Sequence, residues 1–335
     1  MKLTPGKLKG LKAVSNPRGV IAAAAMDQRG SLQKSIGAAR GADANADDLV
    51  VFKEMVTKVL TRYASAILLD PEYGLPAARQ RNDAGLLLAY EKTGYDATTP
   101  GRLPDLLDVW SVRRLKEAGA DCIKILLYYT PYEKPEINEL KHAWIERIGD
   151  ECNYHDIPFF MEPVGYDENG KGEKTIDYAK KKPSVVTKTM EEFGKERYSI
   201  DILKVEVPVE MTFVEGTQAY KGEKAYTRTE ALQMFRDAES TTDKPFIYLS
   251  AGVTNPIFIE TLALAGEAGT RFSGVLCGRA TWYDGIKVYA QQGAGAFEHW
   301  LNTQGVENIK NVNEAVKVAT PWYEKLGASS MDELG

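Results

Sequence analysis

The sequence has few of the residues that mark disulfide-rich, metal-binding or redox proteins. It contains only three cysteines in 335 residues, and no two of them have CxxC spacing. A sparse, odd set of cysteines argues against a disulfide framework and a zinc knuckle, and it favours a reducing compartment. The histidines are equally few and fall in predicted helices or loops, so no cluster predicts a catalytic metal. These residues are Cys122, Cys152, Cys277, His142, His155 and His299.

Strong charge and long apolar runs are also missing. The formal net charge is −5 and the sequence pI about 5.5, which speaks against a nucleic-acid partner. No window approaches 18 consecutive apolar residues, and the N-terminal stretch has no apolar core of a signal peptide. The Gly293-Ala294-Gly295 motif lacks the third glycine of a dinucleotide fingerprint. We therefore expect a cytoplasmic protein with no membrane partner and no cofactor.

The sequence does contain eight short apolar runs rich in β-branched and large aliphatic residues. Their apolar residues are consecutive rather than alternating, which is typical of parallel strands buried on both faces. The runs are Gly19–Met26, Ser65–Asp70, Gly85–Tyr90, Cys122–Tyr128, Ile157–Glu162, Asp201–Val207, Pro245–Ser250 and Ser273–Cys277.

Helical patterns fill most gaps between these runs. Residues 47–64 carry an apolar stripe at spacings of three and four, and Thr229 is a candidate N-cap. Asn255 is a second candidate N-cap, followed by Pro256 at the first helical position. Eight alternations of strand and helix predict an α/β fold, a single (β/α)8 TIM barrel, over an open doubly wound sheet. We expect one domain over residues 1–335, with helical extensions at both ends. The polar segment Tyr166–Pro183 is expected to be one long insertion between a strand and a helix.

Polar and charged residues inside or just after the apolar runs are the candidates for chemistry, because barrel active sites form at the C-terminal ends of the strands. Lys124 and Lys204 are notable, since each has apolar neighbours within its run and a buried lysine is costly unless it is paired. The full set is Asp27, Asp70, Glu72, Glu91, Lys124, Glu162, Lys204, Glu206, Ser250 and Arg279.

Two lysines directed into one barrel suit imine chemistry with a carbonyl substrate. Burial or a second nearby cation lowers a lysine pKa and supplies the neutral amine that attacks a carbonyl. Glu162 is placed to move protons during imine formation, and Asp27 could accept the proton of the hydroxyl that becomes an aldehyde. Glu206 lies two residues from Lys204 and could simply neutralise it. The residue chemistry alone leaves open which lysine forms the imine.

The ends of the last two runs suggest a phosphate site. Ser250 and Gly252 follow the seventh run, and Gly278 and Arg279 follow the eighth. Loops at these positions in barrels often hold a phosphate through main-chain N–H groups, and an arginine adds a bidentate donor.

Several longer segments resemble the bacterial tagatose 1,6-diphosphate aldolases, a family of class I, Schiff-base aldolases. The similarity extends from near the N-terminus to the eighth run and is more specific than a general barrel pattern. The segments are Met26–Leu32, Leu68–Arg79, Gly85–Asp96, Arg102–Asp121, Ile123–Tyr129, Asp201–Met211, Tyr248–Val253 and Ser273–Trp282.

The resemblance implies metal-free cleavage of tagatose 1,6-bisphosphate to dihydroxyacetone phosphate and glyceraldehyde 3-phosphate. It assigns the imine lysine to Lys204, the proton-transferring glutamate to Glu162 and an accessory lysine to Lys124. It places Asp27 in a DQRG motif. The implied binding residues are Gln28, Ser250, Gly252, Gly278 and Arg279.

Substrate and assembly are open to alternatives at this level. The substrate could be fructose 1,6-bisphosphate or a related ketose 1-phosphate. The protein could also be another imine-forming barrel enzyme, such as a dehydratase. A regulatory barrel that only binds phosphorylated metabolites would have no reason to keep Lys204, Lys124 and Glu162 together. We expect a phosphorylated ketose as the partner and a homo-oligomer as the assembly.

Overall fold

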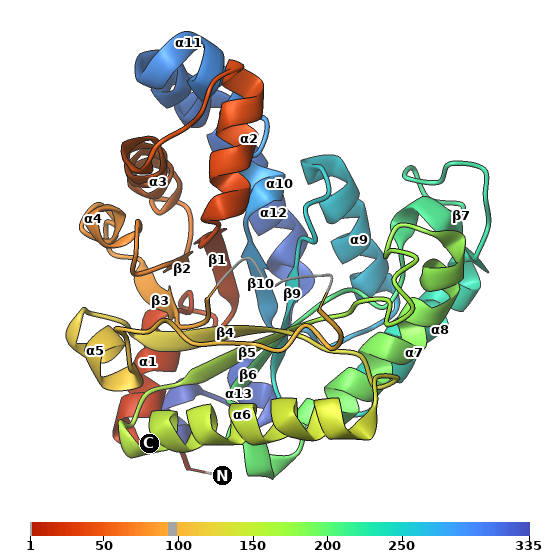
Figure 1. Cartoon of the computed structure of the whole chain (residues 1–335). Coiled ribbons are helices and arrows are strands. Elements are labelled where there is room, and N and C mark those ends of the chain that lie inside the picture. The colour runs from red at the N-terminus through yellow and green to blue at the C-terminus, as the bar shows by residue number, and fades with distance from the viewer. Residues whose placement is uncertain (1, 93–98) are drawn as a thin grey trace.

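The computed structural model describes residues 2–92 and 99–335, and its strands form one closed parallel barrel (Figure 1). The strand order is β1-β10-β9-β6-β5-β4-β3-β2, and β1 pairs with both β10 and β2 to close the ring. The predicted (β/α)8 barrel is confirmed, and the open doubly wound alternative is wrong because that sheet would leave two edges unpaired. The end of the segment Gly85–Asp96, from residue 93 on, lies outside the described residues.

All eight predicted runs form barrel strands, most of them shortened by one or two residues. The barrel strands are β1 (Ile21–Met26), β2 (Ala66–Leu69), β3 (Gly85–Ala89), β4 (Cys122–Tyr128), β5 (Phe159–Val164), β6 (Ile202–Val205), β9 (Phe246–Leu249) and β10 (Gly274–Cys277). A small two-stranded sheet, β7 (Val214–Glu215) and β8 (Tyr226–Thr227), lies outside the barrel between β6 and the next helix. Two boundaries matter for the site: β5 continues beyond Glu162, and β6 ends before Glu206.

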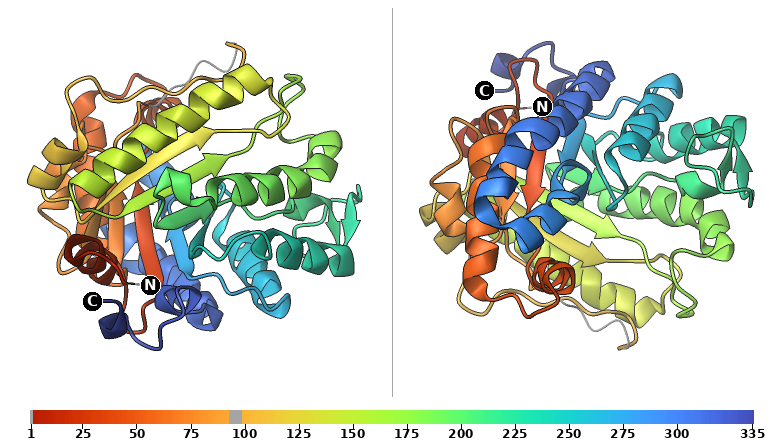
Figure 2. Two further views of the ribbon diagram at one scale, coloured as in Figure 1. Left: turned by 90° about the horizontal axis from the view of Figure 1, so that it is seen from below. Right: turned by 90° about the horizontal axis from the view of Figure 1, so that it is seen from above.

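Helices surround the strands, as the views from below and from above show (Figure 2). They are α1 (Pro5–Ala13), α2 (Gly30–Arg40), α3 (Ala46–Leu60), α4 (Leu75–Ala78), α5 (Val112–Glu117), α6 (Pro135–Tyr154), α7 (Ile176–Phe193), α8 (Arg228–Glu239), α9 (Asn255–Glu267), α10 (Arg279–Trp282), α11 (Gly285–Trp300), α12 (Val306–Ala315) and α13 (Trp322–Lys325). Short 3-10 helices are η1 (Glu196–Tyr198), η2 (Met211–Phe213), η4 (Val316–Val318) and η5 (Met331–Leu334), and η3 (Leu301–Gly305) is a π-helix.

The structure corrects two predicted helix starts. Thr227, not Thr229, is the N-cap of α8, and it forms a capping box with Glu230. Thr254, not Asn255, is the N-cap of α9. In a capping box, the N-cap hydroxyl accepts from the main-chain N–H three residues later, and the glutamate at that position accepts from the N-cap main-chain N–H. Thr227 and Glu230 have this spacing.

The expected insertion at Tyr166–Pro183 is also shorter than predicted. Helix α7 begins at Ile176, where the side chain of Thr175 accepts a hydrogen bond from the main-chain N–H of Tyr178. Pro183 lies inside this helix rather than before it. The polar loop therefore covers residues 165–175, and it lies at the C-terminal end of β5.

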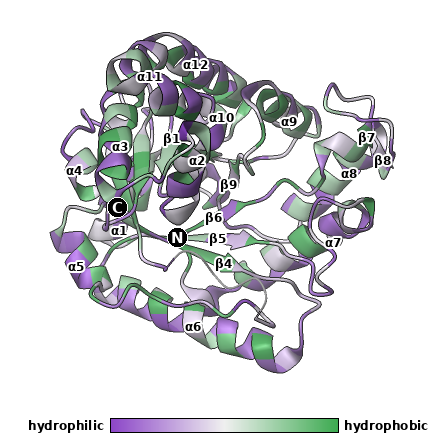
Figure 3. Ribbon diagram, turned by 45° about the horizontal axis from the view of Figure 1, so that its top comes forward, coloured by the Kyte–Doolittle hydropathy of each residue, from purple (hydrophilic) through white to green (hydrophobic). Residues whose placement is uncertain are grey.

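The core has an outer and an inner part. Between strands and helices, large apolar side chains pack in a continuous layer that includes Phe52, stacked on Phe297 at a centroid distance of 4.4 Å. Figure 3 shows apolar colour on the strands and alternating apolar and polar colour along the surrounding helices. Inside the barrel, a second cluster includes Ile21, Ala23, Ala25, Ala66, Leu68, Leu87, Ala89, Cys122, Phe160, Ile202, Ile247 and Leu276. This cluster fills the N-terminal part of the barrel interior, and polar side chains occupy the C-terminal part.

The two ends of the chain meet beneath the barrel (Figure 2). The main-chain N–H of Leu3 donates a hydrogen bond to the carbonyl of Leu334 at 2.8 Å. The indole of Trp322, fully buried, donates to the hydroxyl of Ser15 at 2.9 Å. Of the helices in residues 2–92 and 99–335, none combines the length and apolar character needed to cross a membrane.

Candidate active site

Five charged side chains form a layer directly above the apolar cluster inside the barrel. Successive side chains of a strand alternate between its two faces, so a residue two positions beyond an inward one also points inward. Each member of the layer stands two positions beyond an inward residue of the apolar cluster. The members are Asp27, Glu91, Lys124, Glu162 and Lys204, which follow Ala25, Ala89, Cys122, Phe160 and Ile202. The structure thus brings together the four predicted catalytic residues and adds Glu91.

Lys124 is the centre of this layer. Its side chain is fully buried, and its Nζ lies 2.9 Å from Asp27 Oδ2, 2.9 Å from Glu91 Oε1 and 2.8 Å from Glu162 Oε2. Burial opposes the charged form, but the three carboxylates together raise the pKa of Lys124 well above its usual value. Lys124 is therefore held as an ammonium group.

Lys204 has a different environment. Its Nζ lies 2.8 Å from Glu162 Oε1, and this is its only carboxylate partner among the described residues. Glu162 thus bridges the two lysines, with one oxygen on each. Among the described residues, Lys204 thus makes one ion pair with a carboxylate, whereas Lys124 makes three.

Glu206 does not neutralise Lys204. Strand β6 ends at Val205, and the Glu206 carboxylate accepts a hydrogen bond from the main-chain N–H of Gly165 at 2.7 Å. Its other oxygen lies 3.4 Å from Nζ of Lys182, on helix α7. The expectation of a possible Lys204–Glu206 pair was wrong, since period 2 holds only while the strand continues.

Asp27 lies across the barrel from the Lys204–Glu162 pair and is buried. Burial alone would raise the pKa of Asp27, but Lys124, Lys204 and Lys53 lower it below its usual value. The side chain is therefore a carboxylate at neutral pH, which is the form that can accept a proton.

Glu91 is the residue of this layer that had no predicted role. It is 1% exposed, and its Oε2 has no hydrogen-bond partner among the described residues. Burial raises the pKa of Glu91, and the guanidinium of Arg29 donates to its main-chain carbonyl at 2.8 Å. Glu91 was among the charged candidates of the sequence, and its position two residues beyond the inward Ala89 is the signal that could have placed it in this layer.

The predicted phosphate residues meet at the other side of the barrel mouth. Gly252 has a φ of +74°, and a Cβ at this position would lie 2.6 Å from Cζ of Arg279. A Cβ on Gly278 would lie 3.6 Å from Nε2 of Gln28. The loops after β9, β10 and β1 therefore converge, with Ser250 buried at the base.

Arg279 presents its charge at this convergence. The residue is exposed, and neither a hydrogen bond nor an ion pair links its side chain to another described residue. Arg279 could instead have formed a salt bridge across the barrel rim, but no such ion pair is present in residues 2–92 and 99–335. A guanidinium that makes no ion pair with a carboxylate of the described residues, and that lies beside a glycine loop, is suited to bind an anion.

Comparison with known proteins identifies the family of this chain. A sequence profile of the DeoC/LacD family aldolase matches residues 21–284. The chain belongs to the DeoC/LacD aldolase family. This aldolase is therefore a carbon–carbon lyase, and the charged layer lies within the matched region.

Its relatives are similar along nearly their whole length. It is 54% identical over 328 residues to tagatose 1,6-diphosphate aldolase 2 of Enterococcus faecalis, with 97% of this chain and 98% of the relative covered. It is 52% identical over 330 residues to tagatose 1,6-diphosphate aldolase of Listeria monocytogenes, with 98% and 97% covered.

Among solved structures, fructose-bisphosphate aldolase from Plasmodium falciparum superposes with a TM-score of 0.68. The match covers 96% of this chain and 97% of that one at 13% identity, so it speaks for the barrel fold alone.

Proposed function

We propose that the protein is a metal-independent class I aldolase that cleaves tagatose 1,6-bisphosphate to dihydroxyacetone phosphate and glyceraldehyde 3-phosphate. The observation that carries the proposal is the bridging of Lys204 and Lys124 by Glu162, at 2.8 Å to each. Two buried lysines that share one carboxylate bring a nucleophile, a proton-transferring group and a fixed positive charge together in one site.

Lys204 is the proposed nucleophile and Lys124 the fixed charge. An amine attacks a carbonyl only in its neutral form, and three carboxylates hold Lys124 as an ammonium. Lys204 has one carboxylate partner among the described residues, Glu162, so fewer ion pairs oppose its use as the nucleophile. The geometry thus supports the assignment on grounds that the residue chemistry alone did not supply.

The proposed reaction begins with attack of Lys204 Nζ on C2 of the ketose. Glu162 transfers protons as the carbinolamine loses water, and the product is an iminium ion. Asp27 then takes the proton from the C4 hydroxyl while the C3–C4 bond breaks. The electron pair of that bond moves into the iminium to give an enamine, and glyceraldehyde 3-phosphate leaves. Protonation at C3 and hydrolysis release dihydroxyacetone phosphate and free Lys204.

The 1-phosphate is proposed to lie against Gly252, Gly278 and Arg279, with Ser250 and Gln28 as further contacts. Positive φ at Gly252 leaves the main chain open to an anion, because there is no Cβ in the way. In this arrangement the cation of Arg279 balances the phosphate charge.

Substrate identity rests on the names of the relatives, so it needs its own test. Tagatose and fructose differ in configuration at C4, whose hydroxyl faces the proposed base Asp27. We propose to compare kcat/KM for tagatose 1,6-bisphosphate and fructose 1,6-bisphosphate. A clear preference for the fructose epimer would refute the substrate but leave the reaction class intact.

The reaction class is tested by borohydride reduction in the presence of dihydroxyacetone phosphate, followed by peptide mass mapping. The expected adduct lies on Lys204. No adduct on any lysine would favour the regulatory barrel that only binds phosphorylated metabolites.

We also propose a cytoplasmic location and a homo-oligomeric assembly, which fractionation of cells and light scattering of the purified protein would test.

A further inference from the structure

Lys53 is a fully buried lysine that the proposed reaction does not use. It belongs to α3, outside the barrel, and lies on the apolar face of that helix with Phe52 and Val56. Burial of an ammonium group costs several kcal/mol unless hydrogen bonds and a counter-ion compensate it. The contacts that compensate the charge of Lys53 therefore indicate what this side chain does.

The ammonium of Lys53 holds the main chain on both sides of Asp27. It donates to the carbonyl of Met26 at 2.6 Å and to the carbonyl of Gln28 at 2.8 Å. Met26 is the last residue of β1, so main-chain pairing within the strand ends where Asp27 begins. The two hydrogen bonds from Lys53 hold the main chain on each side of Asp27, where the direction of its side chain is set.

Lys53 is itself held in place by Asp70. Its Nζ donates to Asp70 Oδ2 at 2.6 Å, and both side chains are fully buried. Asp70 Oδ1 accepts from the main-chain N–H groups of Glu72 at 3.0 Å and Tyr73 at 2.8 Å. A continuous set of hydrogen bonds thus runs from the turn after β2, through Lys53, to the backbone of Asp27.

We propose that Lys53 is a positioning residue that fixes the Asp27 carboxylate for removal of the C4 hydroxyl proton. The inference rests on the function proposed above. An ion pair that served stability alone would need only Asp70 as a partner. Lys53 also donates hydrogen bonds to the main-chain carbonyls of Met26 and Gln28, which flank the proposed base Asp27. Asp27 is needed for cleavage but not for imine formation, so the two steps should respond differently to loss of Lys53.

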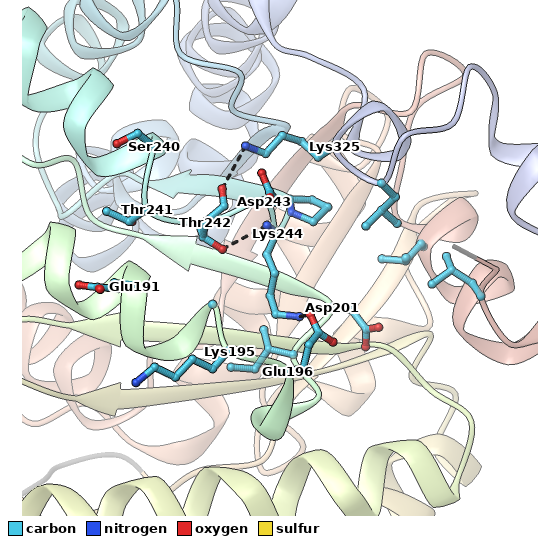
Figure 4. Close-up of a pocket in the computed structure, with 16 residues that line it drawn as sticks. Glu191, Lys195, Glu196, Asp201, Ser240, Thr241, Thr242, Asp243, Lys244 and Lys325 are labelled. Atoms are coloured by element: carbon cyan, nitrogen blue, oxygen red, sulfur yellow. Dashed lines mark hydrogen bonds and ion pairs between the residues drawn. The ribbon is translucent and has the colours of Figure 1, made fainter.

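The test uses two variants of the full chain and one matched control. Lys53→Met removes the ammonium, and Lys53→Met combined with Asp70→Asn also removes the carboxylate that would otherwise be buried without a counter-ion. The control is Lys325→Met, because Lys325 is also a buried lysine that donates to a main-chain carbonyl, that of Thr242 at 3.4 Å. Lys325 lies at the N-terminal end of the barrel, beside a cleft of about 520 Å³ (Figure 4).

Two readouts separate positioning from folding. One is kcat for cleavage of tagatose 1,6-bisphosphate, and the other is the yield of borohydride-trapped adduct with dihydroxyacetone phosphate. A misplacement of about 1 Å costs on the order of 100-fold in rate, so kcat of the double variant should fall about 10- to 100-fold. Trapping should stay within about twofold of the native yield, and Lys325→Met should keep both readouts.

The outcomes distinguish this inference from the proposed function. Unchanged cleavage by the folded double variant, or an equal loss of cleavage and trapping, would overturn the positioning role. Failure of the native enzyme to trap dihydroxyacetone phosphate on Lys204 would instead overturn the proposed function. If Lys53→Met alone does not fold, the double variant decides, because it leaves no unpaired charge.

Discussion

Substitution of Gly252 by alanine tests whether the glycine loop and Arg279 form one anion site. Gly252 has a φ of +74°, and the added Cβ would meet the Arg279 guanidinium at 2.6–2.8 Å. Gly269 is a matched control, because its φ is +76° and a Cβ there would have nothing within 4 Å. Both variants place alanine in a left-handed conformation, which destabilises the fold by about 1–2 kcal/mol, but only Gly252→Ala displaces the Arg279 guanidinium.

The size of the effect follows from the contact that is lost. A hydrogen bond between charged partners contributes about 1.5–3 kcal/mol, which corresponds to roughly a 10- to 150-fold loss of kcat/KM. Gly269→Ala should keep the native kcat/KM, while thermal melting should show a similar destabilisation of both variants. Steady-state kinetics on tagatose 1,6-bisphosphate, with the melting curves measured in parallel, gives both numbers.

The comparison has a clear refuting result. If Gly252→Ala keeps kcat/KM within about twofold of Gly269→Ala, displacement of Arg279 does not matter and the anion site is elsewhere. An equal loss in both variants would mean that backbone strain alone reduces activity.

Four further outcomes follow from the same geometry. Arg279→Ala should lower kcat/KM roughly 10- to 150-fold for a ketose bisphosphate and little for an analogue without the 1-phosphate, whereas equal losses would refute phosphate binding. Lys204→Ala should remove activity by several orders of magnitude, and Lys204→Arg should not restore it because a guanidinium stays protonated; an adduct trapped on Lys124 would contradict this. Activity should survive exhaustive treatment with EDTA, and a loss that zinc restores would place the enzyme in the metal-dependent class. Glu91→Gln should keep kcat within about threefold, since the amide oxygen can still accept from Lys124 and the other Glu91 oxygen has no partner among the described residues, while Glu91→Leu should lose about 10-fold or more.

The strands and their number could be predicted because consecutive apolar residues are a local signal. The strand ends could not be fixed to the residue, and this produced the error at Glu206. A carboxylate two positions from Lys204 shares its face only if the strand continues, and here the chain turns after Val205. The N-cap of α8 was misplaced for a similar reason, because two threonines two residues apart both fit the composition of a helix start.

The partners within the charged layer could not be read from the sequence. Asp27 and Lys124 are 97 residues apart, and only the closed barrel brings them to 2.9 Å. Lys53 carried a weak signal, since it occupies a position of the apolar stripe of α3 where a charged residue is unexpected. The donor and acceptor geometry around it still required three separate segments to be placed together.

The small residues under the charged layer have a consequence for how the enzyme tolerates change. Ala25 and Ala89 are the inward residues two positions before Asp27 and Glu91, while Phe160 and Ile202 are those before Glu162 and Lys204. The inward side chains that precede the charged layer are therefore small on β1 and β3 and large on β5 and β6. Enlarging Ala25 or Ala89 to valine would look conservative in any list of hydrophobic exchanges. In this barrel a larger side chain at either position would crowd the Asp27 or Glu91 carboxylate that pairs with Lys124. Laboratory evolution should therefore accept larger inward side chains on β5 and β6 more readily than on β1 and β3.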